Sequence, residues 1–180
     1  MEKRIYKVAE IEETRKEAEE LLSRSLDDEI KERMKAVIEA EAPIRKALLY
    51  KRVLNSFGLQ KVGSRLLSLF EELSLTLSFP TTLDGDGEDV FHKEGNEDFF
   101  RPSPPSALPY SYQIPHQEGA ACILYILETG DKPSLTKGEL YRHFLMEMGW
   151  EKSGRAIEEL FSYALKDKRI KRSGNGRFLK

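Results

Sequence analysis

The chain has 180 residues, of which 29 are Lys or Arg and 31 are Asp or Glu, so its formal net charge is −2. This balance excludes a strong overall electrostatic field, and no apolar run approaches the roughly 20 residues that a membrane-spanning helix needs. The single cysteine, Cys122, can form no internal disulfide, and the first residues lack the apolar core of a signal peptide. We therefore expect a cytoplasmic protein of one or two small domains with no membrane partner.

The first 27 residues predict a helix. Residues 5–26 are rich in Glu, Lys and Ala, and their apolar stripe is thin, with Val8, Ile11 and Leu21 among its members. A narrow stripe is typical of a helix that leans on another element without being buried itself. We expect an N-terminal helix in residues 1–27, packed on a later part of the chain or on a partner.

Residues 28–93 predict a first unit. Asp27-Asp28 resembles an N-cap for the helix that follows. Gly58 predicts the end of a later helix, because glycine accepts the left-handed conformation that closes helices. We expect helices and one short strand at residues 27–42, 44–46 (the strand), 47–57 and from about 63 to 73.

Residues 73–92 predict a hairpin that completes this unit. Residues 73–79 alternate Leu or Phe with Ser or Thr, which is typical of a half-buried strand, and Pro80 would close that strand. Asp and Gly in residues 81–87 suit the positive φ angles of a turn. Residues 90–92 would form the returning strand.

Residues 94–116 show no regular periodicity. The prolines of this stretch exclude both a helix and a sheet ladder. We expect an extended proline-rich linker. Its aromatic residues, Phe99, Phe100, Tyr110 and Tyr112, indicate that it packs on the units that it joins.

A second unit follows the linker. Residues 120–127 are almost wholly apolar, which predicts a central buried helix that Gly130 would cap. Thr136 and Glu139 have the spacing of a capping box, so a helix should begin there. Ser153 is the predicted cap of the last helix.

This second unit, placed at residues 117–180, ends in a predicted hairpin. Its strands would be residues 165–172 and 177–179, and Ser-Gly-Asn-Gly at residues 173–176 would form the turn. Helices followed by a terminal hairpin are the outline of a winged helix.

The two units carry a repeated block. Residues 58–71 begin Gly-Leu-Gln-Lys-Val-Gly and return, at a constant offset of 91, as residues 149–162, which begin Gly-Trp-Glu-Lys-Ser-Gly. Behind each turn, apolar residues recur at the spacing of a helix packed on a core. We predict a mainly α fold with small β-hairpins, in which tandem winged-helix repeats follow the N-terminal helix.

The sequence holds no group of side chains that indicates an enzyme. Residues 84–89 resemble a calcium loop but lack the Gly and Glu that such a loop needs at its sixth and twelfth positions, so a plain turn is favoured. His92, His116 and His143 are far apart and have no ligand at metal spacing. An apolar surrounding raises the pKa of the Cys122 thiol and hides it. We expect a non-catalytic protein with no metal and no cofactor.

Basic residues carry most of the functional information. Residues 165–180 contain seven Lys or Arg against the single acid Asp167, and residues 42–80 contain six against two. Cations on a hairpin and at helix starts suit contacts with phosphates. The candidate nucleic-acid-binding residues are Lys61, Arg65, Lys152, Arg155, Lys168, Arg169, Lys171, Arg172 and Arg177.

Two observations weigh against this interpretation. Charges on a hairpin also serve to keep a sheet edge from pairing with another chain. The helix that would enter a groove carries Glu158 and Glu159, and its counterpart carries Glu71 and Glu72. Carboxylates there repel phosphate, so conventional major-groove recognition by the second unit is disfavoured.

The Glu41-Ala42-Pro43-Ile44 step and the Gly-(Leu/Trp)-x-Lys-x-Gly-(Ser/Arg) turn resemble a domain of unknown function. That domain lies at the C-terminus of large superfamily I helicase-like proteins, which also carry a Vsr-like endonuclease segment. The resemblance covers residues 28–80 and 118–180 and implies a tandem winged-helix accessory module of DNA-processing ATPases. The ATPase and nuclease motifs are absent from this sequence, so the resemblance implies no catalytic residue.

Two functions remain open. In the first, the chain binds DNA or another nucleic acid and acts with a helicase or nuclease partner, and its binding weakens steeply with salt. In the second, it is a protein-interaction module whose winged-helix surfaces and N-terminal helix dock a partner. An association that survives high salt and charge reversal at Lys171 and Arg172 would favour the second.

Overall fold

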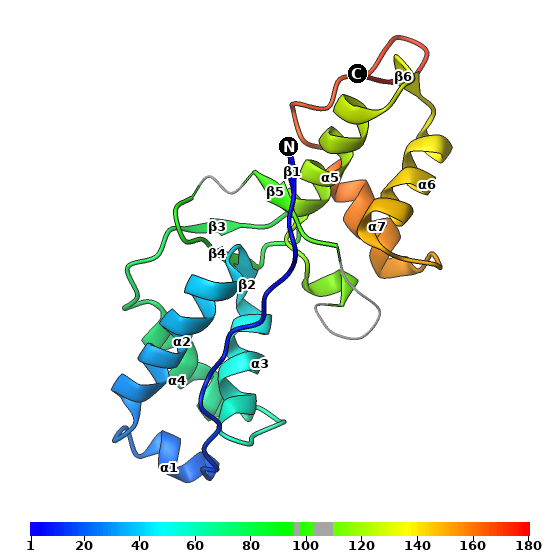
Figure 1. The fold of residues 1–180 in the computed structure, drawn as a ribbon. Helices are drawn as coiled ribbons and strands as arrows, with labels where there is room; N and C mark the ends of the chain where they lie inside the picture. The colour runs from blue at the N-terminus through cyan, green and yellow to red at the C-terminus, as the bar shows by residue number, and fades with distance from the viewer. Residues whose placement is uncertain (96–97, 103–109) are drawn as a thin grey trace. The chain divides into compact units, whose positions relative to one another are not determined.

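The computed structural model describes residues 1–95, 98–102 and 110–180, and in these it contains seven α-helices and three small sheets (Figure 1). The mainly helical fold is therefore confirmed. The chain divides into two compact units that are not contiguous in sequence. The N-terminal unit comprises Lys7–Leu83 and Glu88–Asn96, and the C-terminal unit comprises Met1–Tyr6, Asp84–Gly87 and Glu97–Lys180. No helix among the described residues is long and apolar enough to cross a membrane.

The N-terminal unit is built from four helices and one antiparallel sheet with the order β2-β4-β3. Its core is formed by the apolar stripes of the helices, with Met34, Leu49 and Phe70 fully buried. Gly58 has φ 76° and lies just after Phe57, the C-cap of the third helix, so this helix ends where the sequence predicts. The elements are α1 (Ala18–Leu22), α2 (Asp27–Glu41), β2 (Ile44–Arg45), α3 (Lys46–Ser56), α4 (Ser64–Ser74), β3 (Thr81–Leu83) and β4 (Asp89–Phe91).

In the C-terminal unit, α6 and α7 pack against the nearly apolar α5. The capping box predicted at Thr136 is present: its hydroxyl accepts the Glu139 N–H, and the Glu139 carboxylate accepts the Thr136 N–H. The elements are β1 (Glu2–Lys3), β5 (Phe99–Phe100), the 3₁₀-helix η1 (Ser111–Gln113), α5 (His116–Thr129), β6 (Ser134–Leu135), α6 (Lys137–Met148), α7 (Arg155–Ala164) and β7 (Phe178–Leu179). Strand β1 pairs in parallel with β5, and β6 pairs antiparallel with β7.

The repeat in the sequence reappears in the positions of the elements. Helices α6 and α7 begin 91 residues after α3 and α4. Gly58 and Gly149 have φ angles of 76° and 78° in the turns between these helices. The strand pair Ile44 and Phe91 corresponds to the pair Leu135 and Phe178.

The predicted N-terminal helix is wrong for most of its length. Helix α1 covers only Ala18–Leu22, and the residues before it run without helical hydrogen bonds. Their backbone donors find partners elsewhere: the Ala9 N–H donates to Glu41, and the Thr14 and Lys16 N–H groups donate to the carbonyls of Ser56 and Phe57. These carbonyls lie at the end of α3, where no intrahelical donor remains. The hydrogen bonds therefore pair the N–H groups of the extended chain with the free carbonyls of the helix.

The predicted strand at residues 73–79 is also wrong. The apolar stripe of α4 continues to Leu73, and the chain then closes in turns in which the Thr76 and Leu77 N–H groups donate to Leu73 and Ser74. Leu75 is 86% exposed, so the alternation of Leu with Ser and Thr does not mark one buried face. The first strand of the hairpin lies after Pro80 instead, in β3, and β4 forms the predicted returning strand.

Three cap predictions need correction. The residue before α2 is Leu26, and Asp27 and Asp28 lie in its first turn. Gly154 precedes α7, while the predicted cap Ser153 donates its hydroxyl to Glu158. Gly130 does end α5, but in an extended conformation with φ −65°.

The predicted linker contains ordered parts. Phe99 and Phe100 form β5 and are buried, as expected of aromatic residues that pack on a unit, whereas Tyr110 and Tyr112 are exposed and stack on each other. Residues 96–97 and 103–109, which include most of the predicted linker prolines, lie outside the described residues. The C-terminal hairpin forms, but its first arm is shorter than predicted, because residues 165–170 turn around the end of α7 and pairing begins at Lys171.

Candidate functional site

The candidate cations at the helix starts are exposed. Lys61 precedes α4, and Arg65 in its first turn is 3.8 Å from Glu19. Lys152 precedes α7, and Arg155 pairs with Glu159 at 2.9 Å. Exposed pairs of this kind contribute little free energy, about 0–1 kcal/mol, so Arg65 and Arg155 can exchange these carboxylates for another anion at small cost.

The arginines of the C-terminal hairpin are engaged within the unit. Arg169 binds the carboxylates of Asp167 and Asp98, each at 2.8 Å. The hydrogen bonds between Arg169 and Asp167 lower the pKa of the carboxyl group and raise the pKa of the guanidinium. Arg177 donates to the hydroxyl and the carbonyl of Ser134. Arg169 and Arg177 are therefore less available for nucleic acid than the sequence predicts.

Other cations of this segment keep their charge unpaired. Arg172 donates to the Leu165 carbonyl and lies over the Phe178 ring, and Lys166 lies over the Tyr163 ring, 4.3 Å from its centroid. These partners are neutral. Among the residues that the structure describes, the cations of the segment without a carboxylate partner are Lys166, Lys168, Lys171, Arg172 and Lys180.

The nine predicted residues are divided between the two units. Lys61 and Arg65 belong to the N-terminal unit, and the other seven belong to the C-terminal unit. Within the C-terminal unit, the α6–α7 loop and the hairpin after α7 lie at opposite ends (Figure 1). The continuous part of the candidate interface is therefore residues 165–180, which we call the cationic segment.

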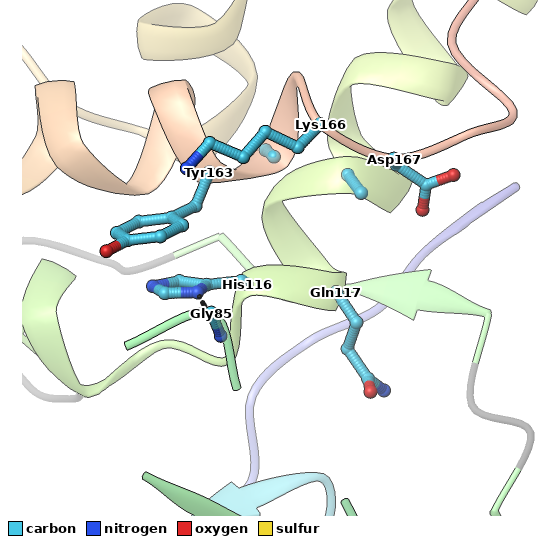
Figure 2. Close-up of a pocket in the computed structure, with 8 residues that line it drawn as sticks. Gly85, His116, Gln117, Tyr163, Lys166 and Asp167 are labelled. Carbon is cyan, nitrogen blue, oxygen red and sulfur yellow. Dashed lines mark hydrogen bonds between the residues drawn. The ribbon is translucent and has the colours of Figure 1, made fainter. Parts of the chain in front are cut away.

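A small pocket of about 210 Å³ lies beside the start of this segment (Figure 2). His116 and Tyr163 stack on one side of it, with ring centroids 4.2 Å apart. The Gly85 N–H donates to His116 Nδ1 at 3.0 Å, and the His116 N–H donates to both oxygens of Asp84 at 3.1 Å. These bonds clasp the turn Asp84–Gly87 onto the N-terminus of α5.

The same clasp brings together three groups that could ligate a metal. Ligand atoms of Asp84, Asp86 and His116 lie within 4.8 Å of one another. Sequence spacing did not indicate this cluster, because about 30 residues separate His116 from the two aspartates. Backbone N–H groups already bind Asp84 and His116, and these hydrogen bonds account for their positions without a bound ion.

Gly85 is required for the clasp. An added Cβ would lie 2.5 Å from Tyr163 Cδ1 and 2.8 Å from His116 Nδ1. We expect Gly85→Ala to lower the free energy of unfolding by about 1–3 kcal/mol, the usual cost of overpacking. Chemical denaturation of the full chain measures this loss. The control is Gly174→Ala, where a Cβ meets no atom within 4 Å, and equal stability of the two variants would contradict the clasp.

Cys122 is buried in α5, as predicted, and burial raises the pKa of its thiol. A protonated, enclosed thiol is a poor nucleophile, and this side chain packs in the core of the C-terminal unit.

Comparison with known families gives one match. Residues 19–68 match the family model described as "Protein of unknown function (DUF3320)". The DUF3320 segment runs from α1 into α4 and so includes Lys61, before α4, and Arg65, in its first turn. It overlaps the first part of the chain for which the sequence resembles a domain of unknown function. No curated protein and no solved structure matches the chain.

Proposed function

We propose that each unit is a winged helix and that the chain is a non-catalytic tandem winged-helix module that binds nucleic acid. The order helix, strand, helix, helix, hairpin in each unit supports this proposal. The sheet order β2-β4-β3, in which the first strand lies beside the last, supports it in the N-terminal unit. In the C-terminal unit the support is β7, which pairs with β6 and forms a bridge to Arg172.

The main support for nucleic-acid binding is the unpaired positive charge of the cationic segment. Five of its cations have no carboxylate partner among the described residues, and Lys168 and Lys171 are also exposed. Cations that protein carboxylates have not neutralised can replace the counterions of a phosphate backbone. The module would therefore hold the backbone of DNA or RNA with this segment.

The exposed faces of α4 and α7 limit how the module reads nucleic acid. Glu71 and Glu72 lie on α4, and Glu158 and Glu159 lie on α7, all of them exposed. Arg24 and Lys46 pair with the two acids of α4, and Arg155 pairs with Glu159. Helices that present such mixed charge are poorly suited to base recognition, so we propose binding that is insensitive to sequence.

The proposed setting is a DNA-processing system. The sequence resembles domains found at the C-terminus of large helicase-like proteins, and the DUF3320 segment overlaps residues 28–80, the first part that carries this resemblance. We propose that the module holds nucleic acid for a helicase or nuclease partner, which supplies the catalytic chemistry.

Charge reversal in the cationic segment tests the proposal. Fluorescence anisotropy with a labelled duplex and a labelled single strand would measure affinity at several salt concentrations. If about four phosphates are contacted, affinity should fall roughly 100-fold between about 50 and 200 mM salt. The double variant Lys168→Glu and Lys171→Glu should bind at least about tenfold more weakly and reduce the slope of log affinity against log salt by about 2.

The control is Arg142→Glu, which makes the same kind of charge change at an exposed position of α6. It should keep the affinity and the slope of the parent chain. Binding that does not respond to salt, or a double variant that matches the control, would overturn the nucleic-acid proposal.

A further inference from the structure

An open groove lies between α6 and α7 of the C-terminal unit. Its volume is about 390 Å³, and Lys137 and Gly138 of the first turn of α6 lie at one end. The rings of Tyr141 and Phe161, with centroids 4.9 Å apart, form the apolar part of its wall. A Cβ at Gly138 would meet no atom within 4 Å, so the backbone is open to a ligand there.

The N-terminal unit contains the same constellation at the offset of 91. Lys46 and Ala47 begin α3 as Lys137 and Gly138 begin α6. Tyr50 and Phe70 form the matching aromatic pair, with centroids 5.6 Å apart. The two units therefore provide an internal comparison of one site.

In the N-terminal unit, carboxylates fill this site. Glu88 accepts the Ala47 N–H at 2.8 Å and pairs with Arg45 at 2.6 Å. Asp89 lies 3.2 Å from the ammonium of Lys46. Tyr50 is only 4% exposed beneath this network. In this unit, Glu88 and Asp89 thus neutralise Lys46 and bind an N–H group at the start of α3, and Tyr50 is buried.

The C-terminal unit lacks the corresponding acids. Phe91 and Phe178 occupy matching positions in the register. Counting back along the chain from these two residues therefore aligns Asn175 and Gly176 with Glu88 and Asp89. Among the described residues, Lys137 has no carboxylate partner and the Gly138 N–H has no acceptor. Tyr141 is only partly buried.

The capping box does not replace the missing acids. Glu139 binds the backbone and hydroxyl of Thr136 and the ammonium of Lys132. The bond to Lys132 and the bonds to Thr136 lower the pKa of Glu139 to about 2. Its carboxylate is therefore held at the cap, and the next N–H groups of α6 remain open.

We propose that this groove binds an acidic segment of a partner protein. One Asp or Glu side chain of the segment would accept the Gly138 N–H and pair with Lys137, as Glu88 and Asp89 do in the N-terminal unit. An apolar side chain next to it would lie against Tyr141 and Phe161. Glu158 lines the opposite side of the groove and disfavours a continuous run of phosphates, so nucleic acid is the poorer occupant.

The probe is a labelled peptide with the sequence of residues 86–92, Asp-Gly-Glu-Asp-Val-Phe-His, added to the full chain. A second peptide carries Gln and Asn in place of its Glu and second Asp. Anisotropy measures affinity, and the NMR amide signal of Gly138 reports the site. We expect the acidic peptide to bind and shift this signal, and the neutral peptide to bind at least about tenfold more weakly.

Variants of the chain locate the contact. Lys137→Glu should weaken the binding of the acidic peptide at least about tenfold. Lys137→Glu should not impair folding, because a glutamate in the first turn of a helix is favourable. Lys137→Gln is a second variant, which removes the positive charge without adding a negative one. Arg142→Glu, on the same helix outside the groove, should bind as the parent does. Equal binding of both peptides, no shift at Gly138, or no effect of either Lys137 variant would overturn the proposal.

This proposal is independent of nucleic-acid binding. The double variant Lys168→Glu and Lys171→Glu should lose DNA affinity and keep peptide affinity. If a duplex shifted the Gly138 signal and the peptide did not, the groove would be part of the phosphate contact, and the inference would be wrong while the proposed function stood.

Discussion

Replacing Glu118 with Gln is expected to lower the free energy of unfolding by about 3–5 kcal/mol, because it leaves a buried guanidinium without its counterion. Glu118 lies in α5 and Arg101 follows β5, and their side chains are 2% and 5% exposed. The carboxylate accepts hydrogen bonds from the backbone N–H, Nε and Nη2 of Arg101. Urea denaturation followed by circular dichroism measures the loss.

A double variant tests whether the loss of stability arises from the unpaired charge or from the packing at these two positions. Arg101→Met with Glu118→Leu removes both charges and keeps a similar volume, so it should recover most of the stability that Glu118→Gln loses. If Glu118→Gln were as stable as the parent chain, the pair would not be buried in solution as it is here.

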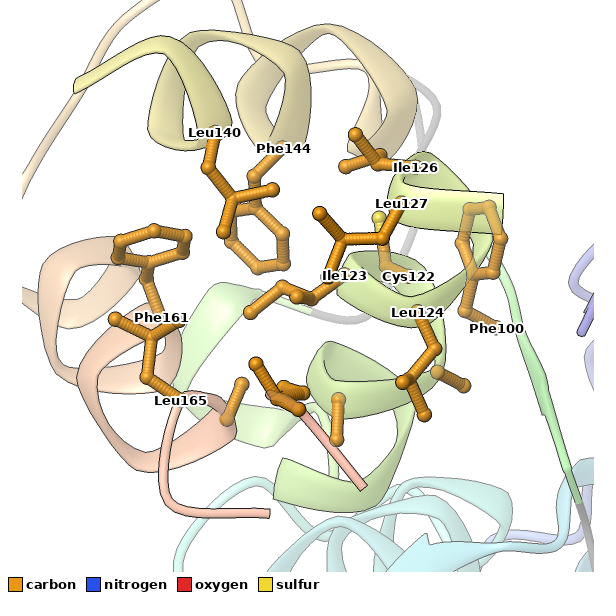
Figure 3. Packing of buried hydrophobic residues seen from close by; sticks show 14 of the residues in the cluster. Phe100, Cys122, Ile123, Leu124, Ile126, Leu127, Leu140, Phe144, Phe161 and Leu165 are labelled. Carbon is orange, nitrogen blue, oxygen red and sulfur yellow. The ribbon is translucent and has the colours of Figure 1, made fainter. Parts of the chain in front are cut away.

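Replacing Phe144 with Ala is expected to lower the free energy of unfolding by about 3–5 kcal/mol, the usual cost of truncating a core aromatic residue. Phe144 is fully buried on α6, and its ring lies 5.2 Å from Phe161 and 5.8 Å from Trp150 between centroids. Figure 3 shows it pointing into the cluster with Leu140 and Ile123. Removing the ring leaves a cavity that its neighbours fill only in part.

The matched control for this variant is Met146→Ala on the same helix. Met146 is 63% exposed, so its truncation should change stability by less than about 0.5 kcal/mol. The two variants are compared by thermal and urea denaturation of the full chain. Similar losses at both positions would contradict the assignment of Phe144 to the core.

Much of the helical framework was predictable because local and tertiary preferences agree. The stripe of α4 and that of α7 both face a core, and the capping box at Thr136 is present. Gly58 and Gly149, which follow the preceding helices, have the left-handed φ that their positions predict. Each of these signals depends on residues within one or two turns of each other, which a sequence displays directly.

The errors occur where long-range partners replace local ones. Residues 5–17 have the composition of a helix, but the carboxylate of Glu41 and the end of α3 bind their backbone in an extended form. Glu41 is fully buried and 3.1 Å from Arg52, a partner that its exposed-looking sequence context does not indicate. Helix propensity is a weak preference, and tertiary hydrogen bonds exceed it here.

In the candidate site, too, some features are visible in the sequence and others depend on long-range partners. The surplus of positive charge in residues 165–180 is visible in the sequence, but the partners of each cation are not. Arg169 reaches Asp98 across 71 residues and Arg177 reaches Ser134 across 43, whereas Lys168 and Lys171 find no carboxylate among the described residues. Position in the folded unit decides which charges remain for a ligand.

Taken alone, the amino-acid sequence determined the repeat, the helices with strong apolar stripes and the total charge of the C-terminal end, because these depend on composition and short spacings. Only the tertiary structure decided which acids cover Lys46, why Lys137 is left uncovered and where the N-terminal residues lie. Those outcomes depend on side chains and backbone groups that meet across tens of residues, where the register of a strand pair selects a Glu in one unit and an Asn in the other.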